Sequence, residues 1–393
     1  MRIAILGGGY AGVTLARRLE RRLPDDVDSV LVDETGTHVI RHELHRLIRR
    51  PALEDDLEIP LRDILDRTTV RMGRVTDVDT DRNEVRLADG DAVTYDVGAV
   101  CLGAEPTFFG MDDVAEHATP MWKFGDALDV RADFYDVLDR GGTAVVGGAG
   151  LTGIQVAGEL AAFAEEEGTP VDDGDGDSDS EGPRIVLLEQ RPAVAPGFRE
   201  DFQRAVRGTL EDYGVTIRTD TTVAGASAAA IETVDGEPIE YDQFVWAGGI
   251  RGPDALGGDR RTVRSDLRLD GDTFVLGDAA QVVDAEGRGV PASAQAAIRE
   301  GRAVAANIER LVERADDPPG GFAPRLPPFT FEAAGWVVSV GDEAVAQVGP
   351  TVLTGPPAKA VKTTVGAGYR TTIGELREAA ARVTEDFGPD VAP

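Results

Sequence analysis

The feature that most limits what this chain can fold into is a glycine-rich turn between an apolar strand and a helix. It first occurs after a predicted buried strand over residues 2–6, where the glycines have G-x-G-x-x-G spacing: Gly7, Gly9 and Gly12. Such glycines permit a tight turn, close approach of the backbone to a pyrophosphate, and close packing of helix on strand. The helix N-terminus then offers free N–H groups to phosphates. The chain therefore begins with a predicted dinucleotide-binding unit.

An acidic side chain completes this first unit. The next predicted strand, residues 29–32, ends at Asp33, which lies 21 residues after Gly12. A carboxylate at this position accepts hydrogen bonds from the adenosine ribose of a bound dinucleotide. Asp33 is therefore a predicted cofactor-binding residue.

The same pattern recurs in the middle of the chain. A predicted strand over residues 143–146 and a helix from about 151 to 164 flank a second set of glycines: Gly148, Gly150 and Gly153. The following strand, residues 184–188, ends at Glu189, which lies 36 residues after Gly153, although the usual gap is about 20. The excess is an acidic, polar insertion over residues 165–183, which we expect to be a solvated loop. We infer that the chain binds two dinucleotides.

Glu189 also bears on which nicotinamide cofactor binds. A carboxylate at the ribose favours NAD over NADP, because it repels a 2′-phosphate. Arg191, two residues later, argues in the opposite direction. We predict NAD(H) at the second turn.

Four further segments carry a family resemblance. YDVGAVCLGAEPTFFGM at 95–111 and IEYDQFVWAGGI at 239–250 resemble two crossings between domains, with Gly103 and Gly248 in their turns. TFVLGDAAQV at 273–282 resembles a G-D-x-A motif, and VPASAQAAIREG at 290–301 an A-Q-x-A-x-Q segment. Over residues 1 to about 373, the chain resembles FAD-dependent pyridine nucleotide-disulfide oxidoreductases. Within them it resembles the type II NADH dehydrogenases, which are NADH:quinone oxidoreductases.

The resemblance implies the cofactors and the site residues. FAD is expected in the first unit, with Gly277 and Asp278 at its ribityl–pyrophosphate part, and Ala294 and Gln295 beside its ring. NADH is expected to give up a hydride, NAD⁺ to leave, and two electrons to pass through the flavin to a quinone.

The expected fold is α/β, with two Rossmann-like dinucleotide-binding domains and a small C-terminal α+β domain. The FAD-binding domain is expected to be discontinuous, over residues 1–110 and 255–320. The NAD(H)-binding domain is expected over 111–254. A proline-rich joint over 316–328 precedes the C-terminal domain, at 326–393.

Two positions depart from the family pattern where the electron acceptor is chosen. Gln155 stands where the family usually has glutamate, and Arg299 replaces the second glutamine of A-Q-x-A-x-Q. Together with Gln295, these are the candidate catalytic residues. A guanidinium can donate to a quinone carbonyl, and it can equally favour an anionic acceptor.

Two other functions therefore stay open. One is a soluble NAD(P)H-dependent reductase of a ferredoxin- or rubredoxin-like carrier. The other is a redox-sensing protein that binds FAD and NAD and signals to a partner.

Charge excludes one class of partner and suggests an environment. The chain has 40 Lys and Arg against 71 Asp and Glu, a net charge of −31, whereas nucleic-acid binding needs clustered cations. So acidic a surface is self-repelling at low salt, which suggests a halophile-like, salt-rich cytosol. No segment has the roughly 18 consecutive apolar residues of a membrane span, and no signal peptide precedes the first strand. We expect a cytoplasmic protein.

The single cysteine, Cys101, excludes the chemistry of related flavoproteins that reduce disulfides or oxidise sulfide, because these need more than one thiol. Cys101 is predicted to be a small packing residue in a strand.

Three histidines occur close together in HVIRHELH: His38, His42 and His45. On a helix they would share one side and could ligate zinc, but no cysteine accompanies them, and we predict no metal site. The same stretch is a basic, amphipathic island within an acidic chain. We expect residues 38–50 to form a helix packed on the FAD-binding domain with a solvated rim; contact with lipid headgroups or an acidic partner is the alternative.

The C-terminal segment gives weak evidence for peripheral contact with the inner face of the cell membrane. Apolar residues recur there at helical spacing: Ile373, Leu376, Ala380, Val383 and Phe387. The opposite face is of mixed charge, whereas interfacial helices prefer a basic face, so a domain-packing or homodimer helix is equally consistent. Before it, residues 335–349 predict a small antiparallel sheet around a Gly-Asp turn.

Overall fold

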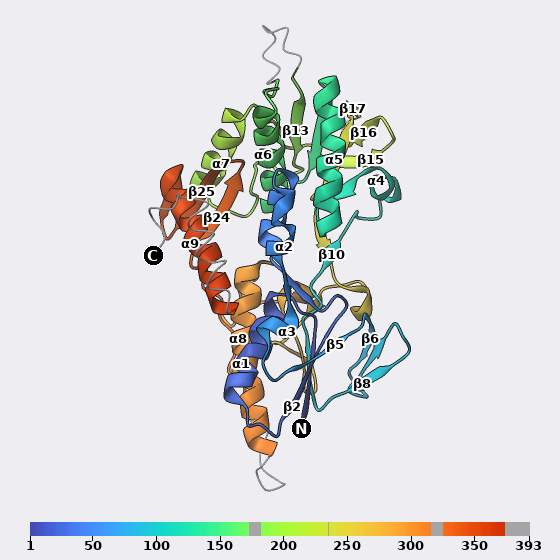
Figure 1. The fold of residues 1–393 in the computed structure, drawn as a ribbon, viewed down its shortest axis with the longest axis vertical. Helices are drawn as coiled ribbons and strands as arrows, with labels where there is room; N and C mark the ends of the chain where they lie inside the picture. Colours follow the sequence, from blue (N-terminus) through green and yellow to red (C-terminus); the bar gives the residue numbers. More distant parts are fainter. Residues whose placement is uncertain (173–181, 235, 316–324, 374–393) are drawn as a thin grey trace. The chain divides into compact units, whose positions relative to one another are not determined.

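The computed structural model describes residues 1–172, 182–234, 236–315 and 325–373 (Figure 1). Its contacts divide the chain into two units. Unit 1 contains residues 1–40, 58–105 and 250–333, and unit 2 contains 41–57, 106–249 and 334–393. Compared with the expected domains, residues 41–57 and the C-terminal part both belong to the unit that carries the second glycine turn.

Unit 1 is built on a six-stranded sheet in the order β21-β22-β9-β1-β2-β5. The strands are β1 (Arg2–Leu6), β2 (Asp28–Asp33), β5 (Thr69–Met72), β9 (Val97–Val100), β21 (Arg268–Asp270) and β22 (Thr273–Val275). All neighbours are parallel except β21 and β22. The interior residues of β1 are completely buried, because this central strand is covered on both faces. Because β9, β1 and β2 are parallel neighbours, their carboxyl ends lie side by side at one edge of the sheet.

Two helices of unit 1 pack against each other: α1 (Tyr10–Arg22) and α8 (Ala294–Ala315). Gly301 lies at their contact, where an added Cβ would stand 2.8 Å from the carbonyl oxygen of Ala11. Glycine thus permits the two backbones to approach closely.

The remaining strands of unit 1 are short. An antiparallel sheet contains β6 (Val75–Asp79), β7 (Glu84–Leu87) and β8 (Ala92–Thr94). β3 (Thr37–Val39) pairs with β4 (Glu58–Pro60), and β20 (Arg261–Thr262) with β23 (Ala280–Gln281). The short helices are α3 (Leu61–Ile64), η3 (Asp254–Leu256) and η4 (Gly277–Ala279).

Unit 2 repeats the parallel architecture with five strands in the order β11-β18-β12-β13-β14. They are β11 (Thr119–Pro120), β12 (Thr143–Gly147), β13 (Arg184–Leu188), β14 (Thr216–Arg218) and β18 (Gln243–Trp246). The helices are α4 (Asp112–His117), α5 (Phe124–Arg140), α6 (Leu151–Glu166) and α7 (Glu200–Asp212). An antiparallel sheet contains β15 (Val223–Ala226), β16 (Ala230–Thr233) and β17 (Ile239–Glu240). Residues 173–181 of the acidic insertion lie outside the described residues.

The C-terminal part of unit 2 forms the predicted antiparallel hairpin and one more strand. β24 (Trp336–Val340) pairs with β25 (Glu343–Val348), which pairs with β26 (Thr351–Thr354), and α9 (Pro356–Ile373) follows. The hairpin packs tightly on α6, since a Cβ at Gly158 would stand 2.6 Å from the backbone nitrogen of Gly341. Ile373 is buried, and the rest of the predicted apolar stripe lies outside the described residues. None of the described helices has the length and apolar character needed to cross a membrane.

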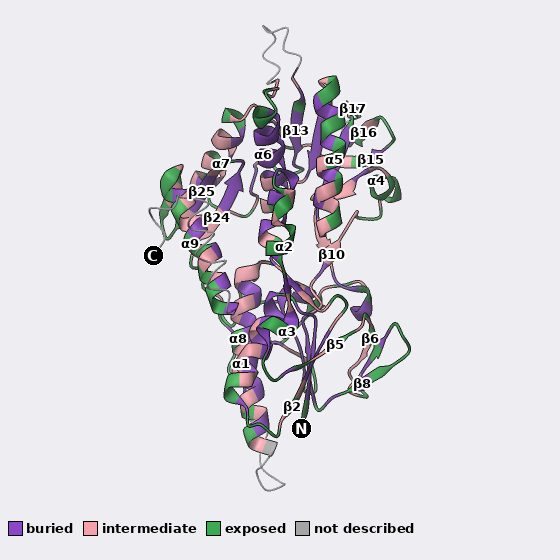
Figure 2. Cartoon of the chain, viewed as in Figure 1, coloured by how far each residue is buried: buried purple, intermediate pink, exposed green. Residues whose placement is uncertain are grey.

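The expectation that residues 38–50 form a helix on the FAD-binding domain is wrong. Residues 41–48 form the 3₁₀ helix η1 (Arg41–Ile48), which belongs to unit 2 and packs on α5 and α6; η2 (Pro51–Leu53) and α2 (Glu54–Leu57) follow it. The stretch is not a solvated basic rim either, because Arg46 and Arg49 are buried. The reason is that these arginines have carboxylate partners inside unit 2. The parallel sheet of the same unit is also buried, as the purple strand β13 shows in Figure 2.

Arg49 is the centre of this packing. Its guanidinium contacts Glu159 of α6 at 2.6 Å, Glu166 at 2.7 Å and Asp342 of the β24–β25 turn at 2.8 Å. Beside it, Arg131 of α5 lies over the Phe163 ring and donates to the carbonyl oxygens of Ile48 and Arg49. One buried cation thus joins segments that are far apart in sequence.

We expect Arg49→Met to lower the free energy of unfolding by about 3–5 kcal/mol, because it leaves the Glu159 carboxylate buried without its cation. Arg50→Met is the matched control: Arg50 is exposed, and its one ion pair within the described ranges is with the partly exposed Glu166, at 3.3 Å. Its loss should cost no more than about 1 kcal/mol. Chemical denaturation of the two variants measures both values, and equal losses would contradict the central position of Arg49.

Candidate functional site

The first glycine turn has the geometry that a phosphate-binding turn requires. Gly7 has a φ of +105° and donates its N–H to the carbonyl oxygen of Val32 at 2.7 Å. A Cβ at Gly12 would stand 1.9 Å from the carbonyl oxygen of Gly7, whereas one at Gly9 would meet no protein atom within 4 Å. Gly12 therefore brings α1 against the strand end, and Gly9 leaves the backbone accessible. A pyrophosphate at the N-terminus of α1 fits this turn.

Asp33 fastens this turn at the end of β2. Its Oδ2 accepts from the N–H of Gly8 at 2.7 Å, and its Oδ1 accepts from the N–H groups of Thr35 and Gly36, both at 2.9 Å. Its Oδ1 also accepts from the Thr35 hydroxyl group at 3.0 Å. Oδ2 accepts one hydrogen bond among those of the described residues and has two lone pairs, so Oδ2 is the oxygen that has room for a ribose hydroxyl. Its contact with ribose stays a prediction.

The second turn repeats the first contact by contact. Gly148 has a φ of +103° and donates to the carbonyl oxygen of Leu188 at 2.8 Å. A Cβ at Gly153 would stand 1.8 Å from the carbonyl oxygen of Gly148, and one at Gly150 would meet no protein atom within 4 Å. Glu189 accepts from the N–H of Ala149 with Oε2 and from that of Arg191 with Oε1, both at 2.9 Å. Unit 2 therefore also fits a dinucleotide.

The likeness of the two turns explains the position of Cys101. A Cβ at Gly7 would stand 2.4 Å from the carbonyl oxygen of Cys101, and one at Gly148 would stand 2.7 Å from that of Ala247. Cys101 and Ala247 thus occupy equivalent positions beside the two turns: their Cβ atoms lie 3.4 and 3.5 Å from where a Cβ at Gly12 and at Gly153 would stand. Burial raises the pKa of the Cys101 thiol far above its ordinary value, so the group stays neutral. The prediction of a packing residue is confirmed.

The turns after the two crossing strands also require glycine. Gly103 has a φ of +73°, and a Cβ there would meet no protein atom within 4 Å. At Gly248 a Cβ would stand 2.3 Å from Cζ2 of Trp246. That indole is fixed by a 2.8 Å hydrogen bond from its Nε1 to the carbonyl oxygen of Thr107.

Two residues that the sequence reasoning missed hold the Gly277–Asp278 turn in unit 1. Oε2 of Glu300, on α8, accepts from the N–H of Gly277 at 2.6 Å. Arg260 donates to the carbonyl oxygens of Asp278 at 2.8 Å and of Ala280 at 2.7 Å. Glu300 could have been noticed as an acidic residue on the buried side of an amphipathic helix. Arg260 gives no local signal, because its partners lie about 20 residues away.

The Glu300 carboxyl group is only 2% exposed. Burial raises its pKa to about 7, with a further rise from the nearby Asp278, despite the opposing effects of the Gly277 N–H and Arg260. The group therefore binds a proton more readily in the folded protein than in the unfolded chain.

The three predicted catalytic residues, Gln155, Gln295 and Arg299, divide between the two units, and Ala294, which is predicted to lie beside the flavin ring, is in the same helix as two of them. Ala294, Gln295 and Arg299 lie in the first turns of α8 in unit 1, whereas Gln155 lies half-buried on α6 in unit 2. The guanidinium of Arg299 lies 5.7 Å from the centroid of the Phe331 ring. The roles of all four residues stay predictions.

The three clustered histidines are not on one helix, so the arrangement that would have placed them on one side does not occur. His38 lies in β3, where its Nδ1 donates to the carbonyl oxygen of Gly8 at 2.8 Å and its ring packs edge-on against Tyr10. His42 and His45 lie in η1, and Nε2 of His45 is 4.0 Å from Oε1 of Glu159. Among the described residues, no group of three or more His, Cys, Asp or Glu side chains is arranged to hold a metal ion.

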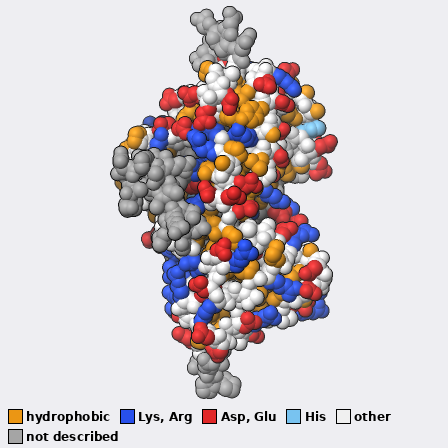
Figure 3. Space-filling view, in the orientation of Figure 1, with side chains coloured by type: hydrophobic (Ala, Val, Ile, Leu, Met, Phe, Trp, Pro, Cys, Tyr) orange, Lys and Arg blue, Asp and Glu red, His pale blue; other side chains and the backbone are white. Residues whose placement is uncertain are grey.

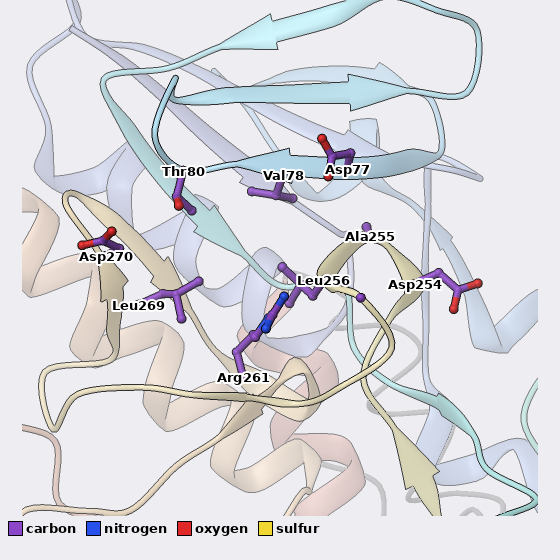
Figure 4. Close-up of a pocket in the computed structure, with 10 residues that line it drawn as sticks. Asp77, Val78, Thr80, Asp254, Ala255, Leu256, Arg261, Leu269 and Asp270 are labelled. Atoms are coloured by element: carbon purple, nitrogen blue, oxygen red, sulfur yellow. The ribbon is translucent and has the colours of Figure 1, made fainter. Parts of the chain in front are cut away.

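A polar hollow of about 580 Å³ lies elsewhere in unit 1, between the β6 strand and residues 254–270 (Figure 4). Arg261 and several aspartates line it: Asp77, Asp254 and Asp270. No residue of either glycine turn contributes to its lining.

Comparison with known proteins supports this interpretation of the turns. Residues 1–301 match the family model described as pyridine nucleotide-disulphide oxidoreductase. The chain is 30% identical over 385 residues to the type II NADH:quinone oxidoreductase NdhA of Mycobacterium tuberculosis, covering 88% of this chain and 79% of that protein. It is 26% identical over 337 residues to the type II NADH:quinone oxidoreductase of Staphylococcus aureus, covering 79% and 82%.

The fold agrees with solved structures. A structure of NDH2 from Plasmodium falciparum superposes with a TM-score of 0.81 at 14% identity, covering 100% of this chain and 99% of that one. The predicted fold class is confirmed.

Glu300 should make the stability of the protein fall as the pH rises. Because the pKa of Glu300 is higher in the folded protein than in the unfolded chain, the folded protein binds this proton more tightly. The stabilisation that the proton gives is therefore lost as the pH rises from about 4.5 to 7. We expect the free energy of unfolding to fall by about 3 kcal/mol more in the wild type than in Glu300→Gln across this range. Denaturation of both proteins at pH 5 and pH 8 measures the difference; parallel curves would contradict the burial argument.

Proposed function

Because the chain belongs to the pyridine nucleotide-disulphide oxidoreductase family, we propose that it is an FAD-dependent enzyme that oxidises NADH and reduces a quinone. The observation that carries this proposal is the pair of matched glycine turns, each fastened by a carboxylate at the end of the next strand. Two dinucleotide sites on one chain are suited to electron transfer from NADH, which binds and dissociates, to FAD, which stays bound. The curated relatives named as NADH:quinone oxidoreductases support the choice of substrates.

Unit 1 binds FAD in this proposal. Bound FAD supplies a two-electron carrier that accepts a hydride from NADH and passes electrons to the quinone. The Gly7–Gly12 turn and the first N–H groups of α1 bind the pyrophosphate, and Asp33 binds the ribose. Asp278 orients the ribityl–pyrophosphate part, from a turn held by Glu300 and Arg260.

Unit 2 binds NADH. The Gly148–Gly153 turn binds its pyrophosphate, and Glu189 faces the adenosine ribose. The backbone N–H groups of Ala149 and Arg191 hold both oxygens of this carboxylate, so its negative charge has a fixed position. A 2′-phosphate would meet this charge at close range, which selects NADH over NADPH.

Three polar side chains are assigned to the substrates. Gln155 orients the nicotinamide through its amide and, unlike a glutamate, has no titratable proton to give or take. Gln295 and Arg299 lie one helical turn apart on α8, and Nη1 of Arg299 donates weakly to the carbonyl oxygen of Gln295 at 3.5 Å. The Arg299 guanidinium donates to a quinone carbonyl oxygen and stabilises negative charge that develops there.

The acceptor is tested by steady-state oxidation of NADH by the purified holoenzyme in molar KCl. We expect turnover with a water-soluble menaquinone analogue and none with a ferredoxin or a rubredoxin. Turnover with a protein carrier and none with the quinone would show that the electron acceptor is that carrier. No turnover with any acceptor, although NADH bleaches the flavin, would favour a redox-sensing protein.

Glu189→Gln should reduce the preference for NADH over NADPH by about tenfold in kcat/KM, because the amide keeps an acceptor for the Ala149 N–H and removes the charge. Glu237→Gln is the charge-matched control, since Glu237 lies in another loop of unit 2. An unchanged ratio of the two kcat/KM values would show that Glu189 does not select the cofactor.

We also propose a salt-rich cytosol as the working environment, supported by the net charge of −31. Repulsion among carboxylates is screened within about 3 Å at molar salt, against roughly 10 Å at 0.1 M. The Tm should therefore rise as KCl is raised from 0.1 M to molar concentrations. A Tm that rises when KCl is removed would refute the proposal.

A further inference from the structure

Among the described residues of unit 1, one buried carboxylate forms no ion pair. Figure 3 shows carboxylate side chains spread over the surface of this acidic chain, where water hydrates them. A buried carboxylate loses that hydration and is usually paired with a cation. Asp266 has Arg268 at 2.8 Å. Asp284 has Arg288 at the same distance. Glu300 on α8, the third buried carboxylate of the described part of unit 1, has no such partner.

The backbone holds Glu300 instead. Oε2 accepts from the N–H of Gly277 at 2.6 Å, and Oε1 has no hydrogen bond within the part of the chain that the structure describes. The nearby cation, Arg260, donates to the carbonyl oxygens of Asp278 and Ala280. The carboxyl group is therefore kept in place by one N–H group and has a second oxygen that can hold a proton.

Glu300 lies beside both turns that the proposed function assigns to FAD. It holds Gly277, and a Cβ at Gly277 would stand 3.3 Å from the Cβ of Ala11, in the first turn of α1. It also acts on Cys101, because burial and then the charge of Glu300 raise the pKa of that thiol. Cys101 in turn lies against the Gly7–Gly12 turn. The carboxyl group is therefore close to the position that the proposed function gives the FAD pyrophosphate.

The described elements packed around Glu300 present one carboxylate and one guanidinium to it, those of Asp278 and Arg260. The contact of α1 with α8 is made by uncharged residues, Ala11 and Thr14. Binding of FAD would add the negative charges of a pyrophosphate, and like charges favour the neutral form of a carboxyl group. Because Glu300 is 2% exposed, salt screens these charges much less than it screens charges on the surface.

We propose that Glu300 is a positioning residue for FAD and is neutral while the cofactor is bound. Its carboxyl group takes up one proton from solvent as FAD binds, and it continues to hold the Gly277–Asp278 turn. Both protonation states keep an oxygen that accepts from the Gly277 N–H, so the turn stays in place while the repulsion is removed. The inference rests on the proposed function, because it requires FAD in unit 1.

Proton uptake on binding gives the affinity for FAD a definite pH dependence. Burial raises the pKa of Glu300 to about 7 in the protein without FAD, and the complex with FAD binds the proton more tightly still. The affinity is therefore highest below about pH 7 and falls as the pH rises above it. Each unit by which FAD raises the pKa weakens binding at high pH by about tenfold.

The test measures the dissociation constant of FAD for the wild type and three variants. Each holoenzyme is diluted in molar KCl at pH 6 and at pH 8.5, and the fluorescence of the released FAD is followed. Glu300→Gln removes the titratable proton and keeps an acceptor for the Gly277 N–H, whereas Glu300→Leu removes the acceptor as well. Glu313→Gln is the matched control, because it makes the same change at an exposed position of the same helix.

We expect the dissociation constants of the wild type and of Glu313→Gln to rise by about tenfold from pH 6 to pH 8.5, and that of Glu300→Gln to stay unchanged. Glu300→Leu should bind FAD about tenfold more weakly at both pH values, because the buried Gly277 N–H loses its acceptor. Circular dichroism at both pH values verifies that each variant is folded. Infrared difference spectroscopy gives a second readout: the wild-type holoenzyme at pH 7.5 should show the C=O stretch of a protonated carboxyl group that Glu300→Gln lacks.

The proposal is overturned if the affinity of Glu300→Gln falls with pH as steeply as that of the wild type, or if the infrared band is absent. A wild type that binds FAD equally well at both pH values also rejects it, and leaves the proposed function in place because FAD is still bound. A wild type that retains no FAD at either pH would reject the proposed function together with this inference.

Discussion

Both units depend on one close contact between a helix and the strand before it. A glycine α-carbon in the first turn of the helix lies against a carbonyl oxygen at the end of the strand, and any side chain on that α-carbon would prevent the contact. Added Cβ atoms at Gly12 and Gly153 would stand 1.9 and 1.8 Å from the carbonyl oxygens of Gly7 and Gly148. The contact places a helix N-terminus directly above a parallel sheet. Free N–H groups and the positive end of the helix dipole then face the position of a phosphate.

The rest of each dinucleotide site follows from this contact. A small residue follows the neighbouring crossing strand and lies against the turn, Cys101 in one unit and Ala247 in the other. The strand on the opposite side ends in a carboxylate, which fixes the middle N–H of the turn and keeps acceptor capacity for a ribose. One geometry thus serves two cofactors, and the difference between them lies in the residues around the turns.

Elements whose signals are local could be predicted from the sequence. The strands at the two turns and the starts of their helices are where apolar runs and glycine spacing put them. The hairpin around Gly341 also follows from alternating residues and a Gly-Asp turn. In each case the residues that decide the structure are neighbours in the chain.

Contacts between distant segments could not be predicted in this way. Arg49 pairs with Glu159 and Asp342, 110 and 293 residues away, so the basic stretch around it was wrongly expected on the FAD-binding domain. Glu300 likewise gains its meaning from the N–H of Gly277, which only the packed fold supplies. Periodicity shows that such a polar residue faces the interior, but not which partner it meets there.

Anaerobic stopped-flow spectroscopy of the purified yellow protein follows, one after the other, the two steps by which electrons would pass from NADH through bound FAD to a quinone. NADH should bleach the flavin absorbance rapidly, and a water-soluble menaquinone analogue mixed in afterwards should restore it at a rate that accounts for turnover. Bleaching without recovery would contradict the quinone step. A flavin that NADH does not bleach would contradict the account of the two sites.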